Sequence, residues 1–117
     1  MIKTRKYLRV PLPIPVRIKV IDRNQEFLMT RIEDISWGGA FVVVEPPPPL
    51  GARIVVQFLI TDDAVALELI GTVLRRRERE NNNPGGVGLQ FDSLDDDSRM
   101  LIQRLINEEV RGLIRSV

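Results

Sequence analysis

The sequence predicts a small, mostly β domain in which six strands precede a single C-terminal helix. Three observations lead to this fold class. Apolar and polar residues alternate with a period of two along most of the chain, as they do in half-buried strands. Clusters of glycine, proline and asparagine separate these runs, as turns require. From residue 98 onward the apolar residues recur at helical spacing instead.

The first two strands are predicted over residues 16–20 and 27–35, and a polar loop joins them into an antiparallel pair. Three prolines, Pro11, Pro13 and Pro15, surround the entry to the first strand. Because proline has no backbone N–H to donate, the proline segment is expected to run extended along an edge or across the mouth of a barrel.

The third strand is predicted over the β-branched residues 41–44, and four prolines at 46–49 then force the chain out of the sheet. Such a run could bind an SH3-type partner, but in a short loop a rigid connector is the better interpretation. The fourth strand is predicted over 53–60 and the fifth over 66–76. The fifth has apolar residues on both faces, as expected of a barrel strand that also supports a helix.

Charged residues at 75–80 lead into a polar tip at 81–86, which predicts a solvated hairpin arm whose charges protect a sheet edge, with a phosphate contact by Arg75 as the lesser alternative. The sixth strand is predicted over 87–91. Residues 93–97 supply a cap residue and a row of carboxylates. They favour a helix start over a divalent metal site, because no second acidic cluster accompanies them. The helix itself is predicted over 98–115.

One stripe of the predicted helix is apolar and is expected to pack on the barrel: Leu101, Ile102, Leu105, Ile106 and Leu113. Met100, Val110 and Ile114 flank this stripe, which makes the helix a candidate surface for a homodimer. Gly112 lowers the helix propensity of the last turns.

The composition bounds the possible chemistry. The 117 residues suffice for one domain, expected to span 1–117 with a core of its own. The chain has no Cys and no His, which excludes disulfides, thiol or histidine catalysis and the usual zinc sites. It has no membrane-spanning apolar run and no signal peptide after Met1, so a cytoplasmic location is expected. The formal net charge is +1, yet the first 31 residues are basic, which suits an anionic ligand, a nucleic acid or a membrane surface.

The turn between the second and third strands carries the pattern D-x-S-x-x-G, at Asp34, Ser36 and Gly39. A carboxylate can accept hydrogen bonds from the N–H edge of a guanine-like base, and a serine hydroxyl can add a rotatable contact. Glycine permits either a positive φ or a close approach of a ligand to the backbone. In an isolated turn the same residues commonly satisfy their own backbone, so the pattern alone does not decide between the two interpretations.

A second pattern, R-x-x-x-R at Arg5 and Arg9, precedes the first strand. Together the two patterns resemble the PilZ family of cyclic di-GMP receptors, in which R-x-x-x-R is followed by [D/N]-x-S-x-x-G. The resemblance extends over nearly the whole chain, because the segments at 51–55 and 88–91 are also similar to family strands. It implies a small six-stranded antiparallel β-barrel with a C-terminal α-helix.

In the resembled family, the positions of Arg5 and Arg9 bind the phosphates or guanines of cyclic di-GMP through forked hydrogen bonds. Asp34, Ser36 and Gly39 would form the other half of this site. The implied site extends to further residues: Lys6, Leu8, Gly38, Arg75 and Gly88.

The resemblance divides the chain into an N-terminal ligand-binding segment (1–12), the barrel (13–92) and the helix (93–117). The arginine segment has no strong local structure of its own, so it is expected to be mobile without ligand and to fold over the barrel on binding. Leu8 and Val10 are placed to guide that closure. This ordering is the expected signal.

Two positions are distinctive within the family pattern. Thr4 stands where many members have another arginine, which lowers the expectation of a stacked ligand dimer. Trp37 occupies a variable position of the turn. It has two possible roles, an exposed aromatic that binds a partner or a side chain that covers the end of the barrel.

The first hypothesis is a cyclic di-GMP-binding receptor or adaptor that passes ordering of its arginine segment to a protein partner, in processes such as motility or biofilm formation. The alternative is a PilZ-like protein-interaction module with weak or no nucleotide binding. A nucleic-acid-binding barrel ranks third, because aromatic residues at 5% offer few stacking platforms. An enzyme ranks last, since the sequence shows no nucleophile–base pair. No metal, cofactor or membrane association is expected.

Overall fold

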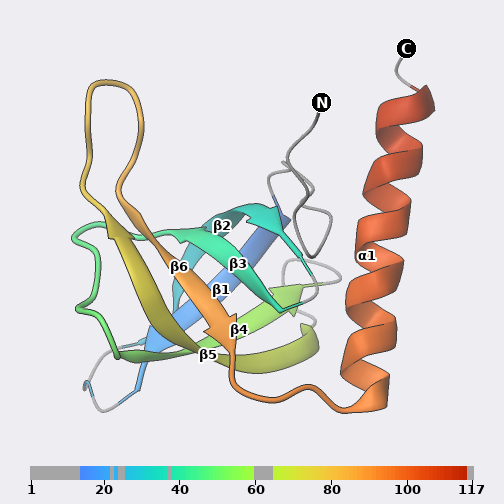
Figure 1. Cartoon of the computed structure of the whole chain (residues 1–117), viewed down its shortest axis with the longest axis horizontal. Helices are drawn as coiled ribbons and strands as arrows, with labels where there is room; N and C mark the ends of the chain where they lie inside the picture. Colours follow the sequence, from blue (N-terminus) through green and yellow to red (C-terminus); the bar gives the residue numbers. More distant parts are fainter. Residues whose placement is uncertain (1–13, 22, 24–25, 37, 60–64, 116–117) are drawn as a thin grey trace, which may run out of the picture.

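The computed structural model describes residues 14–21, 23, 26–36, 38–59 and 65–115. Within these ranges it contains six strands and one helix (Figure 1): β1 (Ile14–Val20), β2 (Leu28–Ile35), β3 (Gly39–Val43), β4 (Arg53–Leu59), β5 (Val65–Arg77), β6 (Gly86–Phe91) and α1 (Asp96–Arg115). The order and type of the elements are those that the sequence predicts. Each predicted boundary lies within two residues of the observed one.

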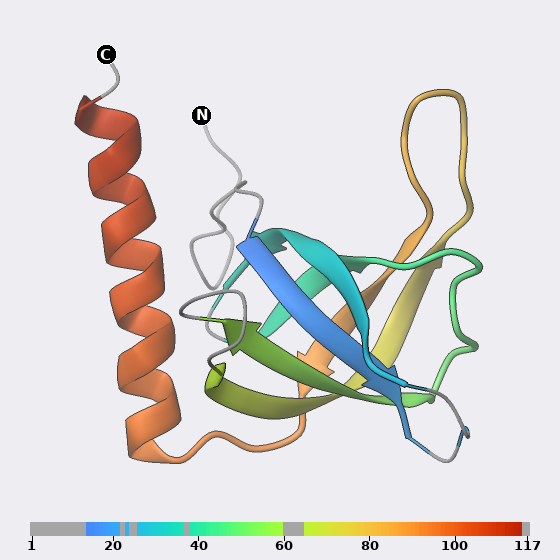
Figure 2. The ribbon, with the colours of Figure 1, turned by 180° about the vertical axis from the view of Figure 1, so that it is seen from behind.

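The strands form a closed barrel in the order β1-β2-β3-β6-β5-β4, and every neighbouring pair is antiparallel. Pairing of β1 with β4 closes the ring, which Figure 2 shows from the side where β1 lies in front. The predicted six-stranded antiparallel barrel with a C-terminal helix is therefore confirmed. Because β3 pairs with β6, the turn between β2 and β3 lies against the last strand before the helix.

The proline segment enters the barrel at β1. Pro15 lies in this strand opposite Arg31 of β2, one residue before the pairing with β4 begins at Val16. Its missing N–H therefore falls outside the β1–β4 pairing, where a proline is tolerated. Pro11 and Pro13 lie outside the described residues.

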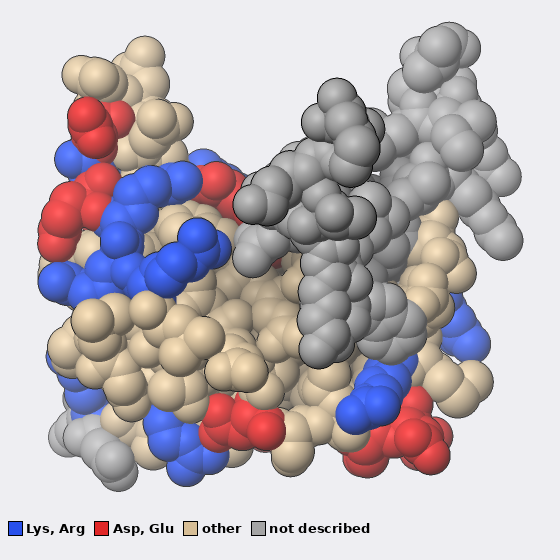
Figure 3. All heavy atoms as spheres, in the orientation of Figure 1, with Lys and Arg blue, Asp and Glu red and all other residues tan. Residues whose placement is uncertain are grey.

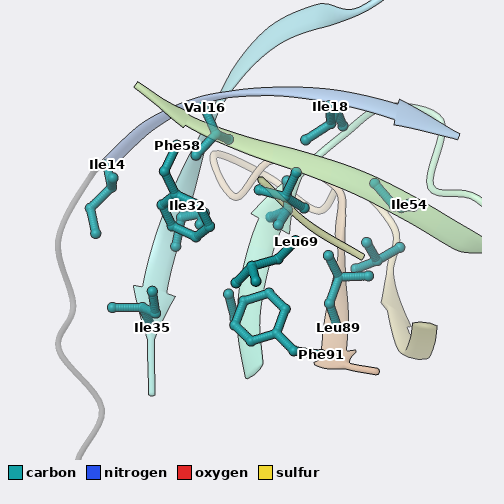
Figure 4. Close-up of a cluster of buried hydrophobic side chains, with 14 of the residues drawn as sticks. Ile14, Val16, Ile18, Ile32, Ile35, Ile54, Phe58, Leu69, Leu89 and Phe91 are labelled. Carbon is teal, nitrogen blue, oxygen red and sulfur yellow. The ribbon is translucent and has the colours of Figure 1, made fainter. Parts of the chain in front are cut away.

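One apolar cluster fills the barrel, and every strand contributes residues to it (Figure 4). The rings of Phe58 and Phe91 meet edge to face, with centroids 6.5 Å apart and planes 66° to each other. Burying one such large apolar side chain contributes about 1.5–3 kcal/mol, so the filled interior is the main source of stability. Polar side chains are left to the outer face.

The long strand β5 shows the predicted alternation. Leu69 and Val73 point inward and are buried, whereas Ile70 and Leu74 point outward. The exposed fractions of Ile70 and Leu74 are 36% and 55%, so the outer apolar face of β5 does not support the helix as expected.

The four prolines form the connector between β3 and β4 that the sequence predicts. The guanidinium of Arg76 holds it, with Nε donating to the Pro48 carbonyl at 3.0 Å and Nη2 to the Pro47 carbonyl at 2.9 Å. Both prolines are buried, which leaves them unavailable to an SH3-type partner. The connector ends in a turn at Gly51, whose φ of +85° favours glycine.

The charged arm extends past β5 and β6 and is closed by paired backbone hydrogen bonds between Glu80 and Asn83. Its charges do not protect a sheet edge, because the barrel is closed there; they bind the connector instead. Arg79 donates to both carboxylate oxygens of Glu45, at 2.8 and 2.9 Å. This pairing, with a further hydrogen bond from the Gly85 N–H, holds the pKa of Glu45 below its ordinary value. Figure 3 shows the blue and red side chains interleaved around the base of the arm.

Arg77 joins three parts of the outer face. Its Nη2 lies 2.6 Å from a carboxylate oxygen of Glu33 on β2, and Nε and Nη2 donate to the Pro84 carbonyl at 3.0 and 2.8 Å. The guanidinium carbon lies 4.2 Å from the ring centroid of Phe41 on β3, a cation–π contact. This single side chain therefore fixes β2, β3 and the arm relative to β5.

The helix α1 stands beside the barrel and is joined to it by residues 92–95 (Figure 1). Its cap is Asp95, whose Oδ1 accepts a hydrogen bond from the Ser98 N–H at 2.7 Å. That bond holds the pKa of Asp95 below its ordinary value. The predicted row of carboxylates therefore belongs to the helix start, and its first member, Asp95, is the cap.

The apolar stripe of the helix meets the barrel at Ile102, which is fully buried in the core cluster. Leu101 is half-buried, whereas Met100 is 63% exposed. The side chains of the other predicted stripe and dimer residues lie outside the described ones: Leu105, Ile106, Val110, Leu113 and Ile114. In the part of the chain that the structure describes, no helix combines the length and apolar character that crossing a bilayer needs.

We expect Arg77→Ala to lower the free energy of unfolding by about 1–3 kcal/mol, because it removes the hydrogen bonds to Glu33 and Pro84 and the contact over Phe41. Urea denaturation followed by circular dichroism measures this change. Arg79→Ala is the matched control, since its ion pair with Glu45 is more exposed to solvent and is expected to contribute less to stability. Equal losses in the two variants would contradict a special role for Arg77.

Candidate functional site on the outer face of the barrel

The D-x-S-x-x-G turn is the hairpin that the sequence predicts. β2 ends at Ile35 and β3 begins at Gly39, and the Ser36 N–H donates to the Gly39 carbonyl at 2.9 Å. The Ser36 side chain is buried, and its hydroxyl donates to the same carbonyl at 3.4 Å. Ser36 thus satisfies its own turn in this state, the ordinary role that the sequence left open. Trp37 lies outside the described residues.

Gly39 is required by a close approach and not by its φ, because Gly51 alone among the described glycines has a positive φ. A Cβ placed on Gly39 would lie 2.2 Å from the carbonyl oxygen of Leu89 on β6. Next to it, the Gly38 carbonyl accepts a hydrogen bond from the Phe91 N–H at 2.9 Å. The turn is therefore fastened to the end of β6 by backbone atoms.

Three predicted site residues, Asp34, Gly88 and Arg75, lie in one row across four strands. Asp34 on β2 pairs with Phe41 on β3, Phe41 pairs with Gly88 on β6, and Gly88 pairs with Arg75 on β5. The neighbouring row contains Ile35, Ala40, Leu89 and Val73, all of which are buried in the core. Since side chains alternate between the two faces of a strand, the row of Asp34 and Arg75 lies on the outer face.

Two register shifts produce this row. One lies between Ile32 and Asp34 in β2, and the other between Val73 and Arg75 in β5. At each shift two consecutive residues oppose one residue of the neighbouring strand, as in a β-bulge. Bulges commonly re-aim side chains next to functional sites, and here they flank the same outer surface from both sides.

Arg75 is the cation at one end of this row. A Cβ on Gly88 would lie 3.1 Å from its Nε and 3.3 Å from its Nη2, so the guanidinium lies against bare glycine backbone. Its side chain makes no hydrogen bond or ion pair to any described residue. It differs in this from Arg76, Arg77 and Arg79, whose guanidiniums are all engaged. Among the arginines at 75–79, Arg75 is thus the one whose guanidinium has no partner among the described residues.

The middle of the row is apolar and fixed. Phe41 is only 8% exposed, because Arg77 covers its ring, and a Cβ on Gly86 would lie 2.7 Å from that ring. Sequence reasoning did not include Phe41 or Arg77 in the site. Neither belongs to a motif, and their position depends on a register that the two shifts alter.

Beyond the row, Asp92 closes the end of β6. Its Oδ1 accepts a hydrogen bond from the Thr72 hydroxyl at 2.7 Å, and its Oδ2 accepts one from Arg53 Nε at 3.0 Å. The Thr72 hydroxyl and the Arg53 guanidinium together hold the pKa of Asp92 below its ordinary value. Both carboxylate oxygens of Asp92 are therefore engaged by partners, and the residue fixes the start of the link to α1.

A pocket of about 430 Å³ lies where the motif turn, the end of β6 and the start of α1 meet. Its walls include Gly38, Gln90, Phe91, Asp92, Leu94 and Arg99. No group of three or more His, Cys, Asp or Glu side chains suited to a metal ion occurs in the described ranges.

The structure thus gathers six of the sequence-predicted site residues on one side of the barrel: Asp34, Ser36, Gly38, Gly39, Arg75 and Gly88. The other four lie outside the described residues: Arg5, Lys6, Leu8 and Arg9. Their part in the site stays a prediction.

We expect Gly39→Ala to destabilise the fold by about 2–3 kcal/mol, because its Cβ would overlap the Leu89 carbonyl and force the hairpin away from β6. Gly51→Ala is the control, because at Gly51 the strain would come from the backbone conformation and not from a steric overlap. There the space is open and only the positive φ is strained, at a cost of about 1 kcal/mol. Thermal unfolding of both variants tests the difference. A Gly39→Ala variant with an unchanged melting temperature would show that the close approach of Gly39 to β6 is not needed.

The family model for the PilZ domain matches residues 3–108. No curated protein matches the chain. Among solved structures, the PilZ domain of YcgR from Escherichia coli with c-di-GMP is similar, with a TM-score of 0.75, 19% identity and 97% of each chain covered. Bacillus subtilis inhibitor of motility (MotI/DgrA) aligns with a TM-score of 0.71 and 17% identity, over 99% of this chain and 54% of that one. The K. pneumonia MrkH–c-di-GMP complex aligns with a TM-score of 0.74 and 16% identity, over 99% of this chain and 56% of that one. This chain spans about half the length of the latter two proteins. By the match over most of its length, the chain belongs to the PilZ domain family.

Proposed function

We propose that this domain is a non-enzymatic receptor for cyclic di-GMP. The observation that carries the proposal is the outer row that puts Asp34 and the uncommitted Arg75 on either side of Phe41 and Gly88, beside the Ser36 turn. The family membership supports it, as do the YcgR and MrkH structures, which are complexes with c-di-GMP.

The chemistry of the ligand fits this row. A guanine presents N1–H and N2–H₂ as adjacent donors, for which the Asp34 carboxylate is an acceptor pair. The ligand's phosphates are anionic, and the planar guanidinium of Arg75 can bind phosphate oxygens or stack on a base. Ser36 would exchange its long bond to the Gly39 carbonyl for a contact to the ligand.

The N-terminal segment, residues 1–12, would supply the remaining contacts. Arg5 and Arg9 would fork onto phosphates or onto guanine O6 and N7, with Lys6 adding charge. Leu8 would dock on the barrel as the segment orders over the ligand. This ordering would be read by a protein partner, in the compartment where the second messenger is made, the cytoplasm.

A second candidate function is a PilZ-like interaction module with weak or no nucleotide binding. The observation that favours it is that the Ser36 hydroxyl already bonds within its own turn. A homodimer through the helix would be one form of such an interaction, with the exposed Met100 in its surface. Ligand titration separates the two candidates.

Arg5→Ala and Arg9→Ala are each expected to weaken cyclic di-GMP binding by about 2–4 kcal/mol, because charge-assisted hydrogen bonds are lost, with little change in melting temperature. Asp34→Asn should weaken binding as well, since the acceptor pair becomes an amide. Titration calorimetry measures this, with Arg23→Ala as an exposed control and with GTP and single-stranded DNA as control ligands. Folded wild-type protein that gives no heat well above micromolar ligand would refute the receptor proposal.

Ligand is expected to slow hydrogen exchange of the backbone amides from Lys6 to Val10. Fixing each residue costs on the order of 1–2 kcal/mol, which phosphate contacts and Leu8 docking must offset. Leu8→Ser should therefore weaken binding although it does not touch the nucleotide. Equal protection of these amides with and without ligand would mean a preformed site, and ordering would not be the signal.

A further inference from the structure

The pocket at the start of α1 lies directly beside the candidate site on the same outer face. Phe41 and Gly88 form the middle of the site row. Gly39 and Gln90 also pair with each other, and each lies two residues away on the same strand, β3 or β6. Two residues along a strand correspond to about 7 Å. A ligand with two bases that holds one base at Asp34 can therefore place the other in this pocket.

The polar groups that face this pocket are mostly uncommitted donors. The side chains of Gln90 and Arg99 make no hydrogen bond or ion pair to any described residue. Asp92, by contrast, has both carboxylate oxygens engaged by Thr72 and Arg53. The half-buried Leu94 adds an apolar wall. An amide and a planar guanidinium beside an apolar wall are suited to a flat heterocycle that carries acceptor atoms.

We propose that this pocket takes the second guanine of cyclic di-GMP, an inference that rests on the receptor function proposed above. Arg99 donates to O6 and N7 of that base, the pair of acceptors that guanine has and adenine lacks. The Gln90 amide contacts the Watson–Crick edge, and Leu94 covers one face. At about 430 Å³ the pocket has room for a purine with its ribose. Because Arg99 belongs to the first turns of α1, the ligand then touches the helix as well as the barrel.

The test compares cyclic di-GMP with the mixed ligand 3′,3′-cyclic GMP–AMP, which has only one guanine. If Asp34 takes one guanine and the pocket takes the other, the wild-type domain should bind cyclic di-GMP about tenfold more tightly than the mixed ligand. Arg99→Ala should weaken cyclic di-GMP binding by a similar factor and reduce this preference to within about threefold. Gln90→Ala should weaken both ligands.

Arg104→Ala is the matched control, because it also removes an exposed arginine from α1, but at a position that does not line the pocket. Melting temperatures of all variants report whether the fold is kept, and Ser93→Trp, which fills the pocket without removing a charge, should also weaken cyclic di-GMP. Wild-type protein that binds neither ligand would refute the receptor function itself. Wild-type protein that binds both ligands equally, or an Arg99→Ala variant that keeps the tenfold preference, would overturn the pocket assignment alone.

Discussion

Closure of the barrel is the constraint on which the other features depend. Once β1 pairs with β4, every strand has two neighbours and one inner face, and the inner face admits only apolar side chains. Ligand-directed chemistry is thereby restricted to the outer face, to the turns and to the link before α1. The interior sets the geometry of the site without contributing an atom to it.

The close packing of glycines against neighbouring strands gives the outer face its shape. Gly39 and Gly86 each place backbone where a side chain would collide with a neighbouring strand, and a Cβ on Gly88 would crowd the Arg75 guanidinium. On this surface Arg77 covers the ring of Phe41, which lies in the row between Asp34 and Arg75. A base or phosphate approaching the surface would meet backbone and a few selected side chains.

Much of this arrangement could be predicted from the sequence, and the failures have physical causes. Strand positions follow from the two-residue period, and the motif turn follows from its spacing. The row that joins Asp34 to Arg75 could not be predicted, because each of the two register shifts changes which residues face each other. The role predicted for the charged arm was also wrong. Its arginines bind proline carbonyls and Glu45 instead of protecting a sheet edge. These contacts join segments about thirty residues apart, which no local pattern encodes. Which residue of the segment 93–97 caps the helix could not be predicted either; it is Asp95, two residues after the segment begins.

The anchoring at both ends of the link has a mechanical consequence for α1. Asp92 is tied to Arg53 and Thr72, and Asp95 is fixed as the helix cap, so only Ser93 and Leu94 lie between the two anchored residues. A helix of 20 residues is about 30 Å long. Turning it by roughly 10° about this two-residue hinge would displace its far end by about 5 Å, several times the movement at the hinge itself. Ile102, which is buried in the core cluster, ties the first turns of α1 to the barrel and opposes such a rotation.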